Sequence, residues 1–356
     1  MFKDLPLGIN VAVFAAAGVV VWIAGTHVAR HADAIQKATG IGEALVGMLL
    51  LGFITALPEL GVTATASHAG NAKLAVNNLL GGMALNVAIL ATADAAIRRE
   101  ALTSAVATTL PMTQGVLLVL MLAIVGGATV VGDRAVLGIG LWSWLLLLVY
   151  VMSVVVVRRS RGHEGWVRNG SEPATSPRGE DARRERDTEG GDGGAPHQRG
   201  ALAPLLGKTA VGAAAILGAG YAIARTGETL AEQTGLGQSF FGAVFLALCT
   251  SLPEISIVFS SVRRGNYAMA VSDIFGANLF GLALLFVVDA IYQGEPALAA
   301  AGRFATFAAL LGIAVTALFI AGLLERRHIM VLRMGVDSLV VIGVYVAGLT
   351  VLYTLK

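Results

Sequence analysis

Apolar runs of about 20 residues or more recur along this chain, and they restrict its fold more than any other feature. Each run is long enough to cross a hydrocarbon core of about 30 Å as a helix. The composition agrees, since 56% of the 356 residues are apolar and only 13% are charged. Strands of a membrane barrel would alternate polar and apolar side chains over about ten residues. The runs show no such alternation, so the sequence predicts an all-α membrane protein.

We predict ten transmembrane helices, over residues 7–29, 41–67, 73–97, 103–127, 134–157, 204–228, 237–262, 267–292, 299–323 and 330–354. Between Arg158 and Gly200, nine Arg and eight acidic residues accompany many Gly and almost no large apolar residues. That composition cannot bury a core. We therefore expect residues 158–203 to form a flexible charged linker between a first five-helix half, 1–157, and a second, 204–356.

The Lys and Arg residues indicate how the chain is oriented in the membrane. Even without the linker region, the loops on the linker's side carry 9 Lys and Arg, against 6 in the other loops. The positive-inside rule then places the linker in the cytoplasm and both termini outside. Because five is odd, the two halves cross the membrane in opposite directions. We expect a multi-pass protein of a prokaryotic cell membrane.

An internal repeat links the two halves at a constant offset of 195 residues. Thr55-Ala-Leu-Pro-Glu59 matches Thr250-Ser-Leu-Pro-Glu254, and Gly70-Asn71 matches Gly265-Asn266. The 40-residue window from residue 55 to residue 94 contains 12 identities without a gap. A repeat in opposite orientations is typical of secondary transporters, whose sites lie near the midplane on interrupted helices. The predicted fold is therefore two inverted-topology five-helix repeats.

Glu59 and Glu254 are the strongest candidates for a binding site. They fall well inside predicted helices, where an ionised carboxylate costs about 2.5–3.5 kcal/mol. No Lys or Arg lies at comparable depth in the same helices, so we expect a mobile cation or a proton as the partner. The preceding prolines should each leave a carbonyl without its helical N–H donor. Thr55 and Thr250, four residues before each Glu, share its helix face.

Asn78 and Asp273, in the next predicted helices, are the following polar residues at depth. Carboxylates, an amide, hydroxyls and carbonyls form an oxygen donor set that suits hard cations such as Ca²⁺ or Na⁺. Zn²⁺ or Cu would favour His and Cys. Asn78 and Asp273 could instead form hydrogen bonds between helices. For Asp94 and Asp289, near helix ends, we expect capping or solvated roles.

Two motifs resemble a known family. Thr250-Ser-Leu-Pro-Glu254, followed by Ser272-Asp-Ile-Phe-Gly-Ala-Asn-Leu-Phe280, is similar to the second α-repeat of the sodium/calcium exchangers, in the cation/calcium antiporter superfamily. Thr55-Ala-Leu-Pro-Glu59, followed by Asn77-Asn-Leu-Leu-Gly-Gly-Met-Ala-Leu-Asn86, resembles the first. The resemblance is detailed within these two motif segments, and the layout of the whole chain agrees with it.

The resemblance implies an electrogenic exchanger that carries Na⁺ one way and Ca²⁺ the other by alternating access, with helices one and six moving against the rest. It implies a central divalent site at Glu59 and Glu254, completed by Asn78 and Asp273. It also implies that oxygens at flanking Na⁺ sites come from Thr55, Thr250 and Ser251. Ala56 stands where the motif usually has Ser, so one hydroxyl of the first half is missing.

The sequence is compatible with three alternative functions to different degrees. The same Glu pair could exchange Ca²⁺ for protons, which the loss of the hydroxyl at residue 56 favours. A channel explains two equivalent Pro-Glu elements less well. A membrane-embedded enzyme is disfavoured, because no buried Ser/His pair and no HExxH motif occurs. We expect inorganic cations and the bilayer as partners, no nucleic acid and no permanently bound cofactor; a monomer is compatible with this interpretation.

Overall fold

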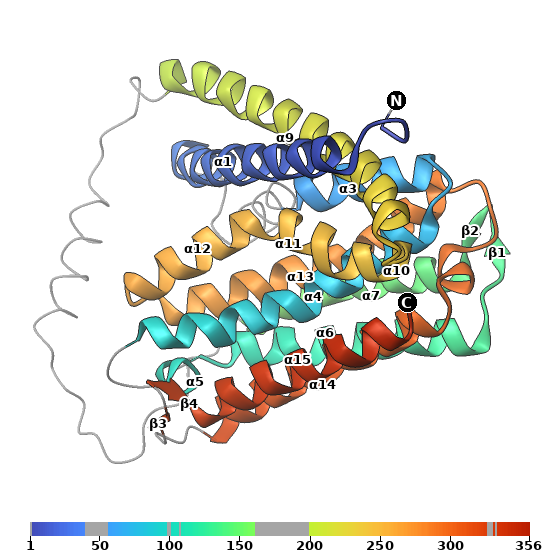
Figure 1. The fold of residues 1–356 in the computed structure, drawn as a ribbon. Helices are drawn as coiled ribbons and strands as arrows, with labels where there is room; N and C mark the ends of the chain where they lie inside the picture. Colours follow the sequence, from blue (N-terminus) through green and yellow to red (C-terminus); the bar gives the residue numbers. More distant parts are fainter. Residues whose placement is uncertain are drawn as a thin grey trace, which may run out of the picture.

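The computed structural model describes residues 2–39, 56–97, 101–106, 108–160, 199–325, 330–331 and 333–356. These residues form a bundle of helices with two small hairpins (Figure 1). Elements of the first half are α1 (Leu7–Thr39), α3 (Leu57–His68), α4 (Ala72–Ala93), the 3-10 turn η1 (Asp94–Ala96), α5 (Leu102–Ala105), α6 (Leu110–Val131), β1 (Ala135–Val136), β2 (Ile139–Gly140) and α7 (Leu141–Ser160).

The second half follows a similar order, although α14 spans the part of the repeat that α5 and α6 divide in the first half. Its elements are α9 (Arg199–Thr234), α10 (Gln238–Phe241), the π-helical segment η2 (Gly242–Leu246), α11 (Ala247–Thr250), α12 (Leu252–Arg263), α13 (Tyr267–Ile291), α14 (Ala297–Glu325), β3 (Met330–Val331), β4 (Met334–Gly335) and α15 (Val336–Thr354). Helix α9 already begins at Arg199, so the last residues of the predicted linker are helical.

Among the described residues, seven helices are long and apolar enough to cross a membrane. An eighth span is broken, because residues 238–250 and α12 meet at Ser251 with a bend of 50°. The prediction of one helix over residues 237–262 is corrected accordingly. Helix α7 contributes a shorter apolar stretch, Leu141–Val157. Most of the predicted second helix, 41–67, lies outside the described residues, which here begin again at Ala56.

Three predicted helix starts are also wrong by several residues. Helix α6 begins at Leu110 rather than at residue 103, because Pro111 occupies its first turn, where the missing N–H costs nothing. The predicted helices 134–157 and 330–354 each begin with a β-hairpin instead. Gly138 turns the first hairpin with a φ of 81°, a conformation that glycine adopts without strain.

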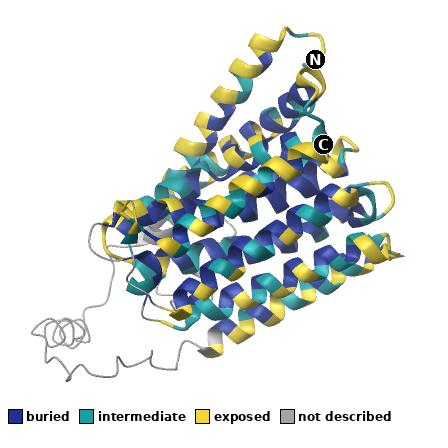
Figure 2. Ribbon diagram, turned by 60° about the horizontal axis from the view of Figure 1, so that its bottom comes forward, coloured by how far each residue is buried: buried dark blue, intermediate teal, exposed yellow. Residues whose placement is uncertain are grey.

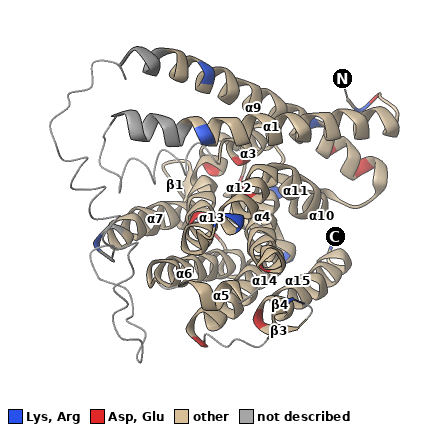
Figure 3. Ribbon diagram, turned by 90° about the vertical axis from the view of Figure 1, so that its left-hand side faces the viewer, with Lys and Arg blue, Asp and Glu red and all other residues tan. Residues whose placement is uncertain are grey.

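Helix α4 lies at the centre of the bundle, whereas α1 and α9 lie side by side on its outside (Figure 1). In the most apolar window of each helix, 94% of α4 is buried, against 28% of α1 and 22% of α9. Figure 2 shows the same contrast, with the buried surface concentrated in the middle of the bundle. Most of the ribbon carries no charged side chain (Figure 3). This distribution suits a bundle surrounded by lipid, in which outer helices expose apolar residues.

Glycine allows the central helices to approach closely. A Cβ at Gly81 on α4 would collide with the backbone of Ala243 in η2, and one at Gly242 would meet the carbonyl of Leu74. The two hairpins lie at opposite ends of the bundle, and both termini lie at the end that holds β1 and β2 (Figure 1).

Candidate cation site

The two Pro-Glu pairs lie at the starts of helices. Pro58 and Pro253 lie in the first turns of α3 and α12, and each Glu follows in the same turn. Carboxylates are stabilised at a helix N-terminus by the helix dipole and the free N–H groups there. Glu254 is 2% exposed. Within the described part of the chain, the Oε2 atoms of Glu59 and Glu254 are buried without a hydrogen-bond partner.

A small cavity connects these carboxylates to the two central helices. Its volume is about 20 Å³, which suffices for about one water molecule or one ion of similar size. Its lining comes from the start of α3, from α4, α12 and α13, and consists of Ala56, Glu59, Asn78, Leu79, Gly82, Met83, Asn86, Glu254, Ala277, Asn278 and Gly281. No basic side chain belongs to this described lining. The cavity is therefore suited to a small dehydrated cation.

Asn78 differs from the other amides of the cavity in its hydrogen bonding. It is 1% exposed, and among the described residues neither its Oδ1 nor its Nδ2 has a hydrogen-bond partner. An unsatisfied buried polar group costs about 1–3 kcal/mol. A ligand that contacts Asn78 would offset this cost.

Asn86 and Asn278 also line the cavity, and they were not among the predicted site residues. The Nδ2 of Asn86 donates to Oδ1 of Asn278 at 2.9 Å, and Nδ2 of Asn278 donates to the carbonyl of Met83 at 3.2 Å. Asn86 thereby keeps Oδ1 without a partner in the described chain. Both lay inside the quoted motifs, but at the offset of the repeat Asn86 matches Gly281 and Asn278 matches Met83. Neither amide is therefore marked by a polar counterpart in the other half.

Asp273 lies elsewhere. It lines a second pocket of about 110 Å³ between α1, α12 and α13, and not the central cavity that holds Asn78. The polar residues of this second pocket are Thr26, Arg30, Ser256, Ser260, Ser261, Arg264 and Asp273. Asp273 is nevertheless close enough to Glu254 for their charges to interact. The structure thus brings Glu59, Glu254 and Asn78 together in the central cavity and places Asp273 in the neighbouring pocket.

The predicted hydroxyl ligands have different surroundings. Thr250 donates to the carbonyl of Ala247 in its own helix at 3.2 Å and lies beside the carboxylate of Glu59. Ser251 is fully buried at the break before α12, and the described residues provide no partner for its Oγ. Thr55 lies outside the described residues. The described chain contains no cluster of three or more His, Cys, Asp or Glu that could hold a metal, so any cation here would depend on amide and hydroxyl oxygens as well.

The family of the chain follows from its similarity to known sequences. The profile described as "Sodium/calcium exchanger protein" matches residues 9–158 and 205–354. The chain belongs to this family. The resemblance seen in the two motifs is confirmed, and the protein is a transmembrane member of the cation/calcium antiporters.

Relatives and solved structures that resemble the chain agree with this family. The chain is 26% identical over 263 residues to the inner membrane protein YrbG of Escherichia coli K12, covering 73% of each chain. It is 25% identical over 295 residues to CaxA of Alkalimonas amylolytica, named as a candidate antiporter, covering 82% of this chain and 84% of CaxA. Its fold matches the sodium-calcium exchanger NCX_Mj with a TM-score of 0.59 and 12% identity, over 97% of this chain and 99% of that one.

The H⁺/Ca²⁺ exchanger CAX matches with a TM-score of 0.66 and 13% identity, over 97% of this chain and 85% of that one. The predicted fold class, an all-α membrane protein whose ten helices form two inverted repeats, is confirmed by these matches. They leave the coupling ion of this exchanger open, since one matching protein is named for Na⁺ and the other for H⁺.

Proposed function

We propose that this exchanger is a secondary antiporter that exchanges Na⁺ for Ca²⁺ by alternating access. The observation that carries the proposal is the central cavity, where Glu59, Glu254 and Asn78 present buried oxygens without partners among the described residues. Two carboxylates and neutral amide oxygens match the preference of Ca²⁺ for oxygen ligands. Na⁺ that shares these carboxylates competes with Ca²⁺ for the same charge, and this competition couples the two fluxes.

The proposed cation ligands are the two glutamates with Asn78, Thr250 and Ser251, together with Thr55 and, from the cavity lining, Asn86. Asp273 is proposed as an outer ligand, because it lies close enough to Glu254 for the two charges to interact. We further propose that residues 1–157 and 204–356 act as the two repeats, with a cytoplasmic linker at 158–203 and both termini outside.

Alternating access is supported by how the outer helices meet the Pro-Glu helices. A Cβ at Gly25 on α1 would collide with Pro253, the residue before Glu254. Gly220 on α9, the counterpart of Gly25 in the second repeat, lies against the backbone of Gly61 and Val62 on α3. Each outer helix therefore contacts the Pro-Glu helix of the other repeat. Movement of an outer helix would displace the helix that carries a site glutamate.

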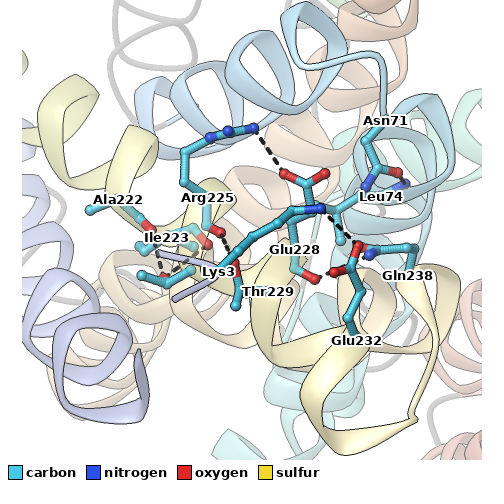
Figure 4. A network of polar contacts seen from close by, with 11 residues as sticks. Lys3, Asn71, Leu74, Ala222, Ile223, Arg225, Glu228, Thr229, Glu232 and Gln238 are labelled. Atoms are coloured by element: carbon cyan, nitrogen blue, oxygen red, sulfur yellow. Dashed lines mark hydrogen bonds and ion pairs between the residues drawn. The ribbon is translucent and has the colours of Figure 1, made fainter. Parts of the chain in front are cut away.

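Helices α1 and α9 are also joined at one end. Lys3 forms an ion pair with Glu232 at 3.3 Å, and Nδ2 of Asn10 donates to Gln233 at 3.2 Å. Figure 4 shows Lys3 and Glu232 beside a second ion pair, between Arg225 and Glu228. The contacts of Lys3 and Asn10 with α9, together with the packing of α1 along α9, favour movement of the two helices as one unit.

Exchange of Ca²⁺ for protons is the second candidate. Ala56 lines the cavity, at the position where the family motif usually carries Ser. A site with one hydroxyl fewer offers Na⁺ fewer oxygen ligands. Protonation of the two carboxylates does not require a hydroxyl ligand.

The test is Ca²⁺ flux into proteoliposomes under an imposed Na⁺ gradient, and separately under an imposed pH gradient. We expect the Na⁺ gradient to drive flux, and we expect Glu59→Gln and Glu254→Gln each to abolish it. Glu232→Gln is the matched control, because it removes a carboxylate from the exposed ion pair with Lys3. If only the pH gradient drives Ca²⁺ flux, the counter-ion is H⁺ and not Na⁺. Flux that survives both cavity substitutions would refute the site.

A further inference from the structure

Two buried aspartates outside the cavity occupy equivalent places in the two repeats. Asp94 directly follows α4 and is 0% exposed; Asp289, its counterpart in the second repeat, lies in the last turn of α13 and is 3% exposed. The Oδ1 of Asp94 accepts the N–H of Leu102 at 2.6 Å, and Oδ1 of Asp289 accepts that of Ala297, also at 2.6 Å. Each aspartate thus fixes a later part of the chain within its own repeat.

The second oxygen of each aspartate reaches into the other repeat. The Oδ2 of Asp94 accepts the N–H of Gly335 at 2.7 Å, and Oδ2 of Asp289 accepts that of Gly140 at 3.2 Å. Gly140 and Gly335 end the two hairpins and are themselves counterparts at the offset of the repeat. The bonds are therefore reciprocal, and they lie at opposite ends of the bundle, where the hairpins are found (Figure 1).

Glycine leaves room for the carboxylates where these bonds form. A Cβ at Gly140 would lie 2.7 Å from Oδ2 of Asp289, and one at Gly335 would lie 3.3 Å from Oδ2 of Asp94, besides closer clashes with Asp133 and Asp337. The N–H groups also indicate what the aspartates do. They direct the positive ends of their dipoles at the carboxylates, as in strong charge-assisted hydrogen bonds. Such surroundings favour an anchor over a cation ligand.

We propose that Asp94 and Asp289 are positioning residues, which hold α4 and α13 against the opposite repeat and so fix the amides of the cavity. Asn86 lies about two helical turns from Asp94, and Asn278 about three turns from Asp289. At 1.5 Å per residue these separations are about 12 Å and about 17 Å along a continuous helix. If the end of α4 shifts, Asn86 shifts with it, and if the end of α13 shifts, Asn278 shifts with it. In a cavity of about 20 Å³, a small displacement changes the distances to the ion.

The direct test is amide hydrogen exchange on the full chain carrying Asp94→Asn or Asp289→Asn. The amide side chain is neutral and keeps one acceptor oxygen in place of two, so both charge-assisted backbone bonds weaken and one of them is lost. We expect Asp94→Asn to speed exchange at least threefold in peptides of β3 and β4, in the second repeat. Asp289→Asn should do so in β1 and β2, in the first. Faster exchange confined to the mutated repeat, or no change, would overturn the proposal.

Asp133→Asn is the control for this measurement. Asp133 accepts the N–H groups of Arg134 and Trp142, both within its own repeat. Its substitution should leave exchange in β3 and β4 unchanged. Because hydrogen exchange does not depend on transport, this arm tests the anchors even if the transported ions differ from those proposed above.

The functional arm rests on the proposed transport and separates positioning from simple loss of folded protein. We expect Asp94→Asn and Asp289→Asn to raise the KM for Ca²⁺ at least threefold, measured per folded molecule. If only the amount of folded protein falls and KM stays constant, the aspartates do not position the site.

A pair of serines provides a matched comparison. The hydroxyl of Ser143 donates to Oδ2 of Asp289. Ser338, its counterpart in the second repeat, is fully buried, and its hydroxyl has no partner in the part of the chain that the structure describes. Ser143→Ala should raise KM in the same direction as Asp289→Asn, about twofold, while Ser338→Ala should leave KM unchanged. Equal effects of the two substitutions would contradict the proposal.

Discussion

The amide nitrogen of Asn86 donates to the amide oxygen of Asn278 across the boundary between the repeats, at 2.9 Å. This bond orients Asn86 so that its own oxygen remains without a partner among the described residues, in the cavity that contains Glu59 and Glu254. The amide of Asn278 therefore holds the amide of Asn86 in its orientation. Glu59 and Glu254 match each other in the repeat, whereas Asn86 and Asn278 do not.

Asn86→Ala should weaken cation binding, because it removes an oxygen from the cavity. We expect KM for the transported cation to rise about tenfold, which corresponds to about 1.4 kcal/mol. The measurement is initial flux against cation concentration in proteoliposomes. Asn77→Ala is the control, since Asn77 is buried in the same helix and bonded to the carbonyl of Lys73, outside the cavity lining. A rise in KM that is equal in both variants would show that any lost amide in α4 has this effect.

Ala56→Ser should strengthen the response to Na⁺, because it adds a hydroxyl oxygen to the cavity lining. We expect half-maximal exchange at a Na⁺ concentration a few times lower than in the unmodified protein. Titration of Ca²⁺ flux with Na⁺ measures the change. Ala66→Ser, at a buried position of α3 outside the lining, is the comparison. If exchange is driven by protons, Ala56→Ser should not lower this Na⁺ concentration.

Adjacent glycines of α4 should separate stability from binding. Gly81→Ala would place a methyl group against Ala243 and should destabilise the protein by about 1–3 kcal/mol. Gly82→Ala makes only an ordinary contact with Ala247, but its methyl group would enter the cavity. We expect thermal unfolding in detergent to shift only for the first, and cation affinity to fall for the second. Gly126→Ala in α6, where no atom lies within 4 Å, should change neither.

Gly25→Ala should slow exchange, because its methyl group would collide with Pro253 beside Glu254. We expect the maximal flux to fall several-fold, since α1 could no longer slide past the start of α12. Gly218→Ala on α9 meets nothing within 4 Å and is the control. An unchanged maximal flux in Gly25→Ala would argue against movement at this contact.

The amino-acid sequence by itself determined the all-α membrane fold and the inverted repeat, and it singled out Glu59 and Glu254 as candidate site residues. Hydropathy is a property of each segment, and a repeat can be found by comparing the chain with itself, so neither requires a three-dimensional structure. The sequence also predicts that Asp94 and Asp289 lie near helix ends, with capping or solvated roles. In the structure each accepts the N–H of the first residue of the following helix, α5 or α14, as a capping residue does. Both are buried rather than solvated, and each is also bonded to the other repeat.

Only the tertiary structure decided which polar residues share the cavity. It joined Asn86 and Asn278 to the glutamates and placed Asp273 in a neighbouring pocket. Whether two side chains meet depends on the axial position and rotation of one helix against another, which sequence offset does not specify. The break at Ser251 and the two hairpins likewise depend on packing. Hydropathy measures how apolar a segment is, and a broken or shortened helix can be as apolar as a continuous one.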